Sequence, residues 1–206
     1  MPELQTFTLP VFPLGSVLYP GGLLPLRIFE PRYLAMVREC LRERRGFAVC
    51  LISEGRETGQ AACFHPVGTL ARIEDHDEDA AGMLHITVRG EQRVQVVASR
   101  VRADQLVLGE ALRLEAEAVT GIAERHRPLV DLLRQALEEY DPDFGRAEEL
   151  LDSTWVGFRL AELLPLPPAR RQWLLELTNP TLRLEALVQF IAAISGSLGT
   201  YQRGPL

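Results

Sequence analysis

Two apolar segments rich in proline and glycine, close to the N-terminus, constrain the fold most strongly. Residues 6–14 have a strand-like composition with two prolines, which confine such a segment to a sheet edge or an irregular strand. A turn at Pro20-Gly21-Gly22 separates them from residues 23–29, a second expected strand. Pro31 suits the first position of a helix, which Gly46 is placed to end. The sequence therefore predicts an irregular strand pair that runs directly into a helix of about three turns.

The next hundred residues show short strand signals separated by turn residues. Apolar runs predict strands at residues 47–52, 67–73, 83–88, 94–97 and 106–114. A polar loop is expected at residues 53–60 and an acidic turn at residues 74–82, and Gly90 is expected to interrupt a strand. Strands at this spacing favour a small barrel over a parallel βαβ sheet.

From about residue 115 the pattern becomes helical. Leu129, Leu133 and Leu137 lie on one helical stripe, and a further helix is expected to stop before Pro165. A short helix should follow from residues 167–168 to 177, and Asn179 should cap the last helix. Residues 141–145 are expected to form a loop and residues 199–206 a loose tail. We predict an α+β fold with a β-rich region at 1–116 and an α-helical region at 117–206.

Composition excludes several kinds of chemistry. All 22 basic residues are arginine, so the sequence offers no P-loop lysine for ATP, no Schiff-base lysine and no Ser-Lys dyad. The net charge of −6 disfavours a general nucleic-acid surface. Three cysteines without a signal peptide or a long apolar run predict a cytoplasmic protein that does not span a membrane.

The candidate catalytic and metal-binding residues are isolated. Residues 74–79 could offer oxygen ligands to a divalent cation, but they lack the spacing of an EF-hand and are better explained as a solvated hairpin tip. Cys63 and His65 could lie on one face of a strand, and a zinc site would also need Cys40 and Cys50 to converge with them. Ser16, Ser53 and Ser153 occur in no hydrolase motif. We therefore predict no catalytic residue, no metal site, no cofactor and no enzymatic activity.

Several motifs together carry a resemblance to a known family. They are Leu9-Pro10-Val11-Phe12-Pro13-Leu14, Pro20-Gly21-Gly22-Leu23-Leu24-Pro25-Leu26, Ile28-Phe29-Glu30-Pro31-Arg32-Tyr33, Val67-Gly68-Thr69-Leu70-Ala71-Arg72-Ile73, Gly90-Glu91-Gln92-Arg93-Val94, Leu163-Leu164-Pro165-Leu166, Leu174-Leu175-Glu176-Leu177 and Leu182-Arg183-Leu184-Glu185. Over residues 8–195 the chain resembles the N-terminal, substrate-binding domain of Lon proteases, in the stand-alone form found in bacteria.

This resemblance implies a fold and a function. The fold would be a six-stranded, PUA-like β pseudo-barrel with one inserted helix, followed by a C-terminal α-helical bundle. The function would be non-enzymatic binding of exposed apolar or unfolded polypeptide segments, or an adaptor role with a partner protein. Because the chain ends at Leu206 and has no lysine, we do not expect the ATPase and protease activities of full Lon.

The expected binding surface rests on arginines and aromatic residues. We predict that Arg27, Phe29, Arg32, Tyr33, Arg72 and Arg93 contact a peptide or partner, with the segment docking between barrel and helices. Arg89 could join these arginines in an anion site, although pairing with Glu30, Glu74 and Glu91 explains them more simply. Leu18, Tyr19, Leu23 and Ile28 could line a groove or belong to the core. The alternatives are an RNA-binding PUA-like module, disfavoured by charge, and a small-molecule or metal-binding protein.

Overall fold

The computed structural model describes residues 5–80, 82–140 and 149–201, and the chain divides into two compact units. Unit 1 comprises Met1–Ala116 and Leu166–Glu176, and unit 2 comprises Glu117–Pro165 and Leu177–Leu206. The sequence analysis placed all of residues 117–206 in one helical region. Residues 166–176 instead belong with the strands, because their polar contacts are made to strand and loop atoms of unit 1.

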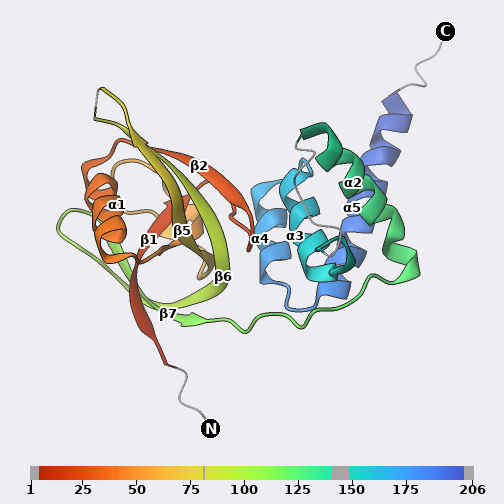
Figure 1. Ribbon diagram of the computed structural model, residues 1–206, viewed down its shortest axis with the longest axis horizontal. Coiled ribbons are helices and arrows are strands. Elements are labelled where there is room, and N and C mark those ends of the chain that lie inside the picture. The colour runs from red at the N-terminus through yellow and green to blue at the C-terminus, as the bar shows by residue number, and fades with distance from the viewer. Residues whose placement is uncertain (1–4, 81, 141–148, 202–206) are drawn as a thin grey trace. The chain divides into compact units, whose positions relative to one another are not determined.

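Unit 1 is built on a closed sheet of seven strands (Figure 1). The strands are β1 (Phe7–Leu14), β2 (Leu23–Ile28), β3 (Phe47–Glu54), β4 (Cys63–Phe64), β5 (Val67–Glu78), β6 (Leu84–Val101) and β7 (Val107–Arg113). Their main order is β1-β7-β6-β5-β3-β4, and β2 pairs with β6 outside this path. Because β1 pairs with both β7 and β3, the sheet closes on itself. The strand-rich fold with an inserted helix was expected, but the resemblance implied six strands.

The first two strands are not partners of each other, contrary to the predicted strand pair. β1 pairs with β7 from Phe7 to Val11 and with β3 from Val11 to Leu14, so it is not an edge strand. Pro10 lies in the first part and Pro13 in the second, and each therefore has a strand neighbour on one side only. A proline, which has no N–H to donate, is compatible with such a position.

Strands β5 and β6 are longer than predicted. Residues 74–78 continue β5, and residues 75–78 pair with β6, so the expected turn is confined to the segment after Glu78. β6 is continuous through Gly90, which was expected to break it. A side chain at Gly90 would overlap the carbonyl oxygen of Tyr19, so glycine is required there by close approach of the backbone.

Helix α1 (Pro31–Glu43) connects β2 to β3 and begins at Pro31 as predicted. Its left-handed terminal residue is Arg44, with φ of 52°, rather than the expected Gly46. Gly46 is needed for another reason, because a Cβ atom there would overlap the carbonyl oxygen of Ala71.

Two apolar clusters fill unit 1. The first joins α1 to the strands, and its buried side chains include Phe12, Tyr33, Met36 and Phe47. The second lies among β1, β3, β5, β6 and β7, and it includes Val11, Val96 and Val107. Helix α4 (Pro168–Glu176) is attached to the same unit through hydrogen bonds from Tyr19 and Gln172.

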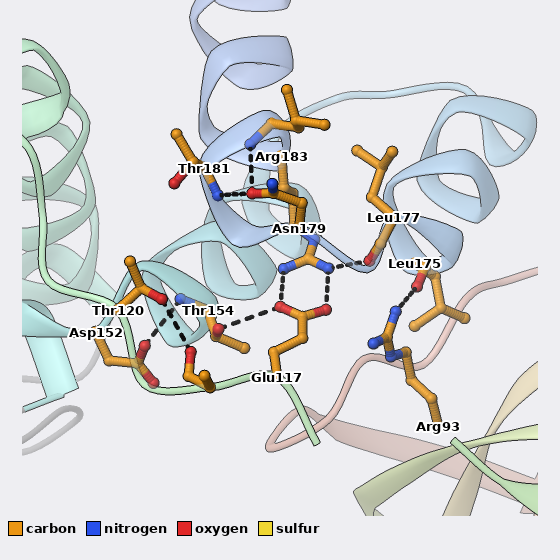
Figure 2. Close-up of polar contacts among 12 residues, drawn as sticks. Arg93, Glu117, Thr120, Asp152, Thr154, Leu175, Leu177, Asn179, Thr181 and Arg183 are labelled. Carbon is orange, nitrogen blue, oxygen red and sulfur yellow. Dashed lines mark hydrogen bonds and ion pairs between the residues drawn. The ribbon is translucent and has the colours of Figure 1, made fainter. Parts of the chain in front are cut away.

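Unit 2 contains the remaining helices: η1 (Glu124–His126), α2 (Arg127–Tyr140), η2 (Glu149–Leu151), α3 (Ser153–Leu163) and α5 (Pro180–Tyr201). Asp152 caps α3 by accepting a hydrogen bond from Thr154 N at 3.0 Å. Asn179 caps α5 as predicted, accepting from Thr181 N at 2.9 Å (Figure 2). The predicted loop at 141–145 lies outside the described residues, and the tail expected at 199–206 is helical through Tyr201.

Candidate functional site

A cavity of about 340 Å³ lies where β2 leads into α1. Its lining is mostly apolar and comes from β1, the end of β2, the start of α1 and the polar loop. The lining residues are Phe12, Leu14, Pro25, Leu26, Arg27, Ile28, Phe29, Glu30, Tyr33, Glu57 and Thr58. Of the six residues predicted to bind a peptide, the structure brings three to this cavity: Arg27, Phe29 and Tyr33.

The wall of the cavity is an aromatic pair anchored in the core. The rings of Phe12 and Tyr33 lie 4.1 Å apart between centroids, and Phe12 also contacts Phe47 at 5.9 Å. Phe12 and Tyr33 are buried in the first apolar cluster. Burial raises the pKa of the Tyr33 hydroxyl, with Arg32 opposing the shift, so this wall stays uncharged at neutral pH. The arrangement can accept an apolar group.

Phe29 and Arg27 belong to the exposed part of the cavity, together with Pro25, Glu57 and Thr58. Alternation along β2 turns Leu24, Leu26 and Ile28 toward the core, whereas Arg27 faces solvent. Phe29 follows the strand and is 57% exposed, a large solvent-facing area for an aromatic side chain. Within the described part of the chain, the Arg27 guanidinium has no hydrogen bond or ion pair. Both side chains are therefore available to a ligand.

Arg32 does not line the cavity but contacts Glu30 and Glu57, which do. Its guanidinium is buried, lies 2.9 Å from the Glu30 carboxylate, and donates to the carbonyl oxygens of Gln105 at 3.1 Å and Glu57 at 3.4 Å. Glu30 in turn accepts a hydrogen bond from Gly59 N at 3.1 Å. Arg32 therefore holds the loop that carries Glu57 and Thr58 against the start of α1.

Arg72 and Arg93 lie elsewhere. Arg72 is exposed on β5 and pairs with Glu91 at 3.3 Å and with Glu74 at 3.6 Å. Arg93 is buried and donates to the Leu175 carbonyl at 2.9 Å, near the C-terminus of α4 (Figure 2). This is a favourable place for a cation, because the last carbonyls of a helix lack intrahelical partners.

The expected pairing with Glu30, Glu74 and Glu91 is observed for Arg32, Arg72 and Arg89. Glu74 accepts a hydrogen bond from Arg89 at 2.5 Å, and this bond holds the pKa of the Glu74 carboxyl below its usual value. The larger apolar residues considered for a groove are also mostly core residues. Leu18, Tyr19 and Ile28 are buried, whereas Leu23 is partly exposed.

The candidate residues for chemistry remain separate. Among the described residues, no group of three or more His, Cys, Asp or Glu side chains is placed to hold a metal ion. Cys40 and Cys50 are buried, and burial raises their thiol pKa to about 11 and about 12, while Cys63 is exposed on β4. Such raised values disfavour the reactive thiolate.

Sequence reasoning missed several residues of the cavity. Four of them, Phe12, Leu14, Pro25 and Leu26, belong to the motifs that carried the resemblance. Their place in these motifs could have identified them as candidates. Glu57 and Thr58 come from a loop with no distinguishing pattern, and contacts with Arg32, Glu30 and Gly15, all distant in the sequence, bring this loop to the cavity.

Comparison with known proteins shows the family of this chain. Residues 8–193 match the family model of the ATP-dependent protease La (LON) substrate-binding domain. The chain is therefore a member of the Lon substrate-binding domain family.

No helix in the described part of the chain is long and apolar enough to cross a membrane.

The chain is also similar in sequence or structure to individual Lon proteins. The Lon N-terminal domain protein from Xanthomonas campestris is 40% identical, covering 89% of this chain and 98% of that one, with a TM-score of 0.76. The N-terminal domain of the Mycobacterium avium complex Lon protease, 20% identical with a TM-score of 0.64, shares the fold, covering 90% of this chain and 98% of that one. Lon protease 2 of Herpetosiphon aurantiacus is 28% identical over 88% of this chain, but the match spans 23% of that protein's length.

Proposed function

We propose that this chain is a non-enzymatic recognition module that binds an apolar side chain of an unfolded polypeptide in the cavity between β2 and α1. The observation that carries the proposal is an apolar cavity with a phenylalanine 57% exposed at its opening, in a chain of the substrate-binding family. Binding would contribute recognition alone or an adaptor function toward a partner protein.

The size of the cavity supports recognition of a side chain rather than of a folded surface. Its volume of about 340 Å³ lies near the lower end of the range of about 300–1,000 Å³ that is usual for ligand pockets. Affinity would come mainly from burial of apolar surface against Phe12, Tyr33 and Phe29.

The charges around the cavity suggest a preference in the neighbouring residues of the polypeptide. Glu30 is paired with Arg32, and Glu57 accepts a hydrogen bond from Gly15 N at 2.7 Å, so both carboxylates are engaged. The Arg27 guanidinium has no such partner within the described residues. An acidic residue beside the apolar one would therefore be favoured over a basic residue.

The same proposal includes the finer description of the fold. We interpret the closed sheet with α1 inserted as a PUA-like pseudo-barrel and unit 2 as a helical bundle, with the cytoplasm as the location. The recognition site belongs to the β-rich region, and the RNA-binding alternative has no supporting feature in the cavity, whose lining holds one arginine and two glutamates.

The experiment is a binding titration with a fluorescein-labelled, reduced and carboxymethylated protein that cannot fold. Phe29→Ser should weaken binding about tenfold or more, because it removes the exposed aromatic surface. Leu182→Ser is the matched control, since Leu182 is 51% exposed on α5 in unit 2. Equal binding by the wild type and by Phe29→Ser would overturn the proposal.

A further inference from the structure

A second apolar groove, of about 410 Å³, separates β4 from the second half of β6. Its lining contains no Asp, Glu, Lys, Arg or His. The lining residues are Ala61, Ala62, Cys63, Phe64, Pro66, Val96, Val97, Ala98, Ser99, Val101 and Val107. All of them belong to unit 1, and the proposed recognition cavity shares none of them.

The groove begins where the pairing of β6 with β5 stops. The ladder between these strands reaches Val67 and Gln95, and one further bond runs from Val96 N to the Pro66 carbonyl at 2.8 Å. From Ala98 to Val101, β6 pairs with β7. Within the described chain, the opposite edge of residues 97–101 has no strand partner.

The direction of the unpaired backbone groups follows from the pairing with β7. Arg102 N donates to the Leu106 carbonyl at 2.9 Å, so the N–H of Arg102 points toward β7. Because backbone groups of successive strand residues point to opposite sides, those of Ser99 and Val101 point away from β7. The register shift between Val96 and Ala98 explains why Val96 N can still face Pro66.

The floor of the groove leads to the second apolar cluster of unit 1. Val96 and Val107 are buried members of that cluster, and Phe64 and Ala61 pack against it. In contrast, Val97 and Val101 are 50% and 53% exposed. An apolar group placed in the groove would therefore contact core side chains and cover two exposed valines.

We propose that this groove binds an extended polypeptide segment, which adds to the sheet as a strand along residues 97–101 of β6. Only an extended backbone offers donors and acceptors with the repeat of about 6.8 Å that Ser99 and Val101 present. The uncharged lining selects an apolar side chain at the position that points inward. The site is independent of the recognition cavity.

The edge has little protection against such pairing. Residues 97–101 contain no proline and one charged residue, Arg100. Proteins that avoid strand addition usually block an exposed edge with proline, an inward-pointing charge or a covering segment. The lack of proline and of further charged residues in this stretch supports a binding role for the edge.

The test uses the full chain and an array of decapeptides that tile the sequence of casein. The strongest binder is then measured in solution by fluorescence anisotropy. Val101→Lys should weaken binding about tenfold or more, because it places a charge at the apolar edge. Val119→Lys is the control, since Val119 is 84% exposed and lies in unit 2.

N-methylation of the peptide distinguishes backbone pairing from general stickiness. Methyl groups on the amides that face β6 should weaken binding about three- to tenfold each, and those on the alternate amides should have little effect. Measuring Val101→Lys and Val119→Lys in a Phe29→Ser background removes the exposed aromatic surface of the recognition cavity, so that the remaining difference in peptide binding reports on the groove.

Three outcomes would overturn the inference: no array peptide binds, Val101→Lys binds every peptide as tightly as the wild type, or N-methylation shows no alternation. A dimer that forms through this edge and is dispersed by Val101→Lys, seen by sedimentation, would also overturn it, because the occupant would then be a second copy of the chain.

Discussion

Two buried arginines, Arg32 in unit 1 and Arg183 in unit 2, have contrasting surroundings. Arg183 forms two bonds to the Glu117 carboxylate, of 2.7 Å and 2.5 Å, and donates to the Leu177 carbonyl at 2.5 Å (Figure 2). Its guanidinium carbon also lies 4.0 Å from the Phe158 ring centroid. Arg32 has one carboxylate partner and two longer bonds to loop carbonyls. The partners of Arg183 surround its guanidinium, whereas Arg32 holds residues that line an open cavity.

The position of each arginine in the chain explains the difference. Glu117 and Leu177 are the residues at which the chain enters unit 2 after each segment of unit 1. Arg183 therefore fixes both entry points in unit 2. Arg32 fixes the loop beside exposed apolar residues, so the comparison separates a site for stability from a site for binding.

Arg183→Met should have the largest effect on stability. It leaves the Glu117 carboxylate, 3% exposed, without its charged partner, and breaking a buried pair in this way costs about 3–5 kcal/mol. Urea unfolding measures the loss. Arg125→Met is the control, because the exposed Arg125–Glu185 pair should contribute at most about 1 kcal/mol. Equal stability of the two variants would contradict the assigned function of Arg183.

Arg32→Met should have a smaller effect on stability and a local effect on the loop. It removes donors from the carbonyls of Gln105 and Glu57, at a cost of about 2 kcal/mol. Glu30 keeps solvent access and should tolerate the loss better than Glu117. Hydrogen exchange at the Gly59 amide should accelerate, because its acceptor Glu30 is no longer fixed. Unchanged exchange at Gly59 would show that Arg32 does not hold this loop.

His126 should make unit 2 sensitive to mild acid. Burial lowers the pKa of this imidazole, Arg125 lowers it further, and Glu185 opposes them. Since the folded pKa lies below the usual value of 6.5, the unfolded chain takes up the proton first, and stability falls as the pH drops through and below 6.5. His126→Asn should reduce the fall in Tm between pH 7.5 and pH 5.5. A fall identical to that of the wild type would exclude this contribution.

Phe29→Ser should have the smallest effect on stability. The side chain is mostly exposed, so the free energy of unfolding should change by about 0.5 kcal/mol or less. Together with a loss of polypeptide binding, this result would sharpen the contrast with Arg183, whose replacement should impair folding first. Strong destabilisation by Phe29→Ser would mean that the residue has a structural function.

Features determined by neighbours in the sequence were the predictable ones. Asn179 and Pro180 start α5 as expected, because an N-cap acts on amides two and three residues later. Arg27, Phe29 and Tyr33 meet at one cavity because all three lie in the short segment that leads from β2 into α1.

Features that depend on distant contacts were not predictable. Gly90 is explained by its approach to Tyr19, and Arg93 by its bond to Leu175, 82 residues away. Residues 168–176 form helix α4, as their pattern indicates, but nothing local shows that this helix belongs with the strands. The contribution of Glu57 to the cavity was missed because it too depends on contacts with distant residues.

Photocrosslinking tests most directly whether the cavity between β2 and α1 binds unfolded polypeptide. Benzoylphenylalanine is introduced in place of Phe29 and, as the control, in place of Leu182, and each protein is irradiated with the carboxymethylated substrate. The proposed function predicts abundant crosslinks from position 29, competed by unlabelled substrate, and few from position 182. Equal yields at both positions, or none at position 29, would contradict it.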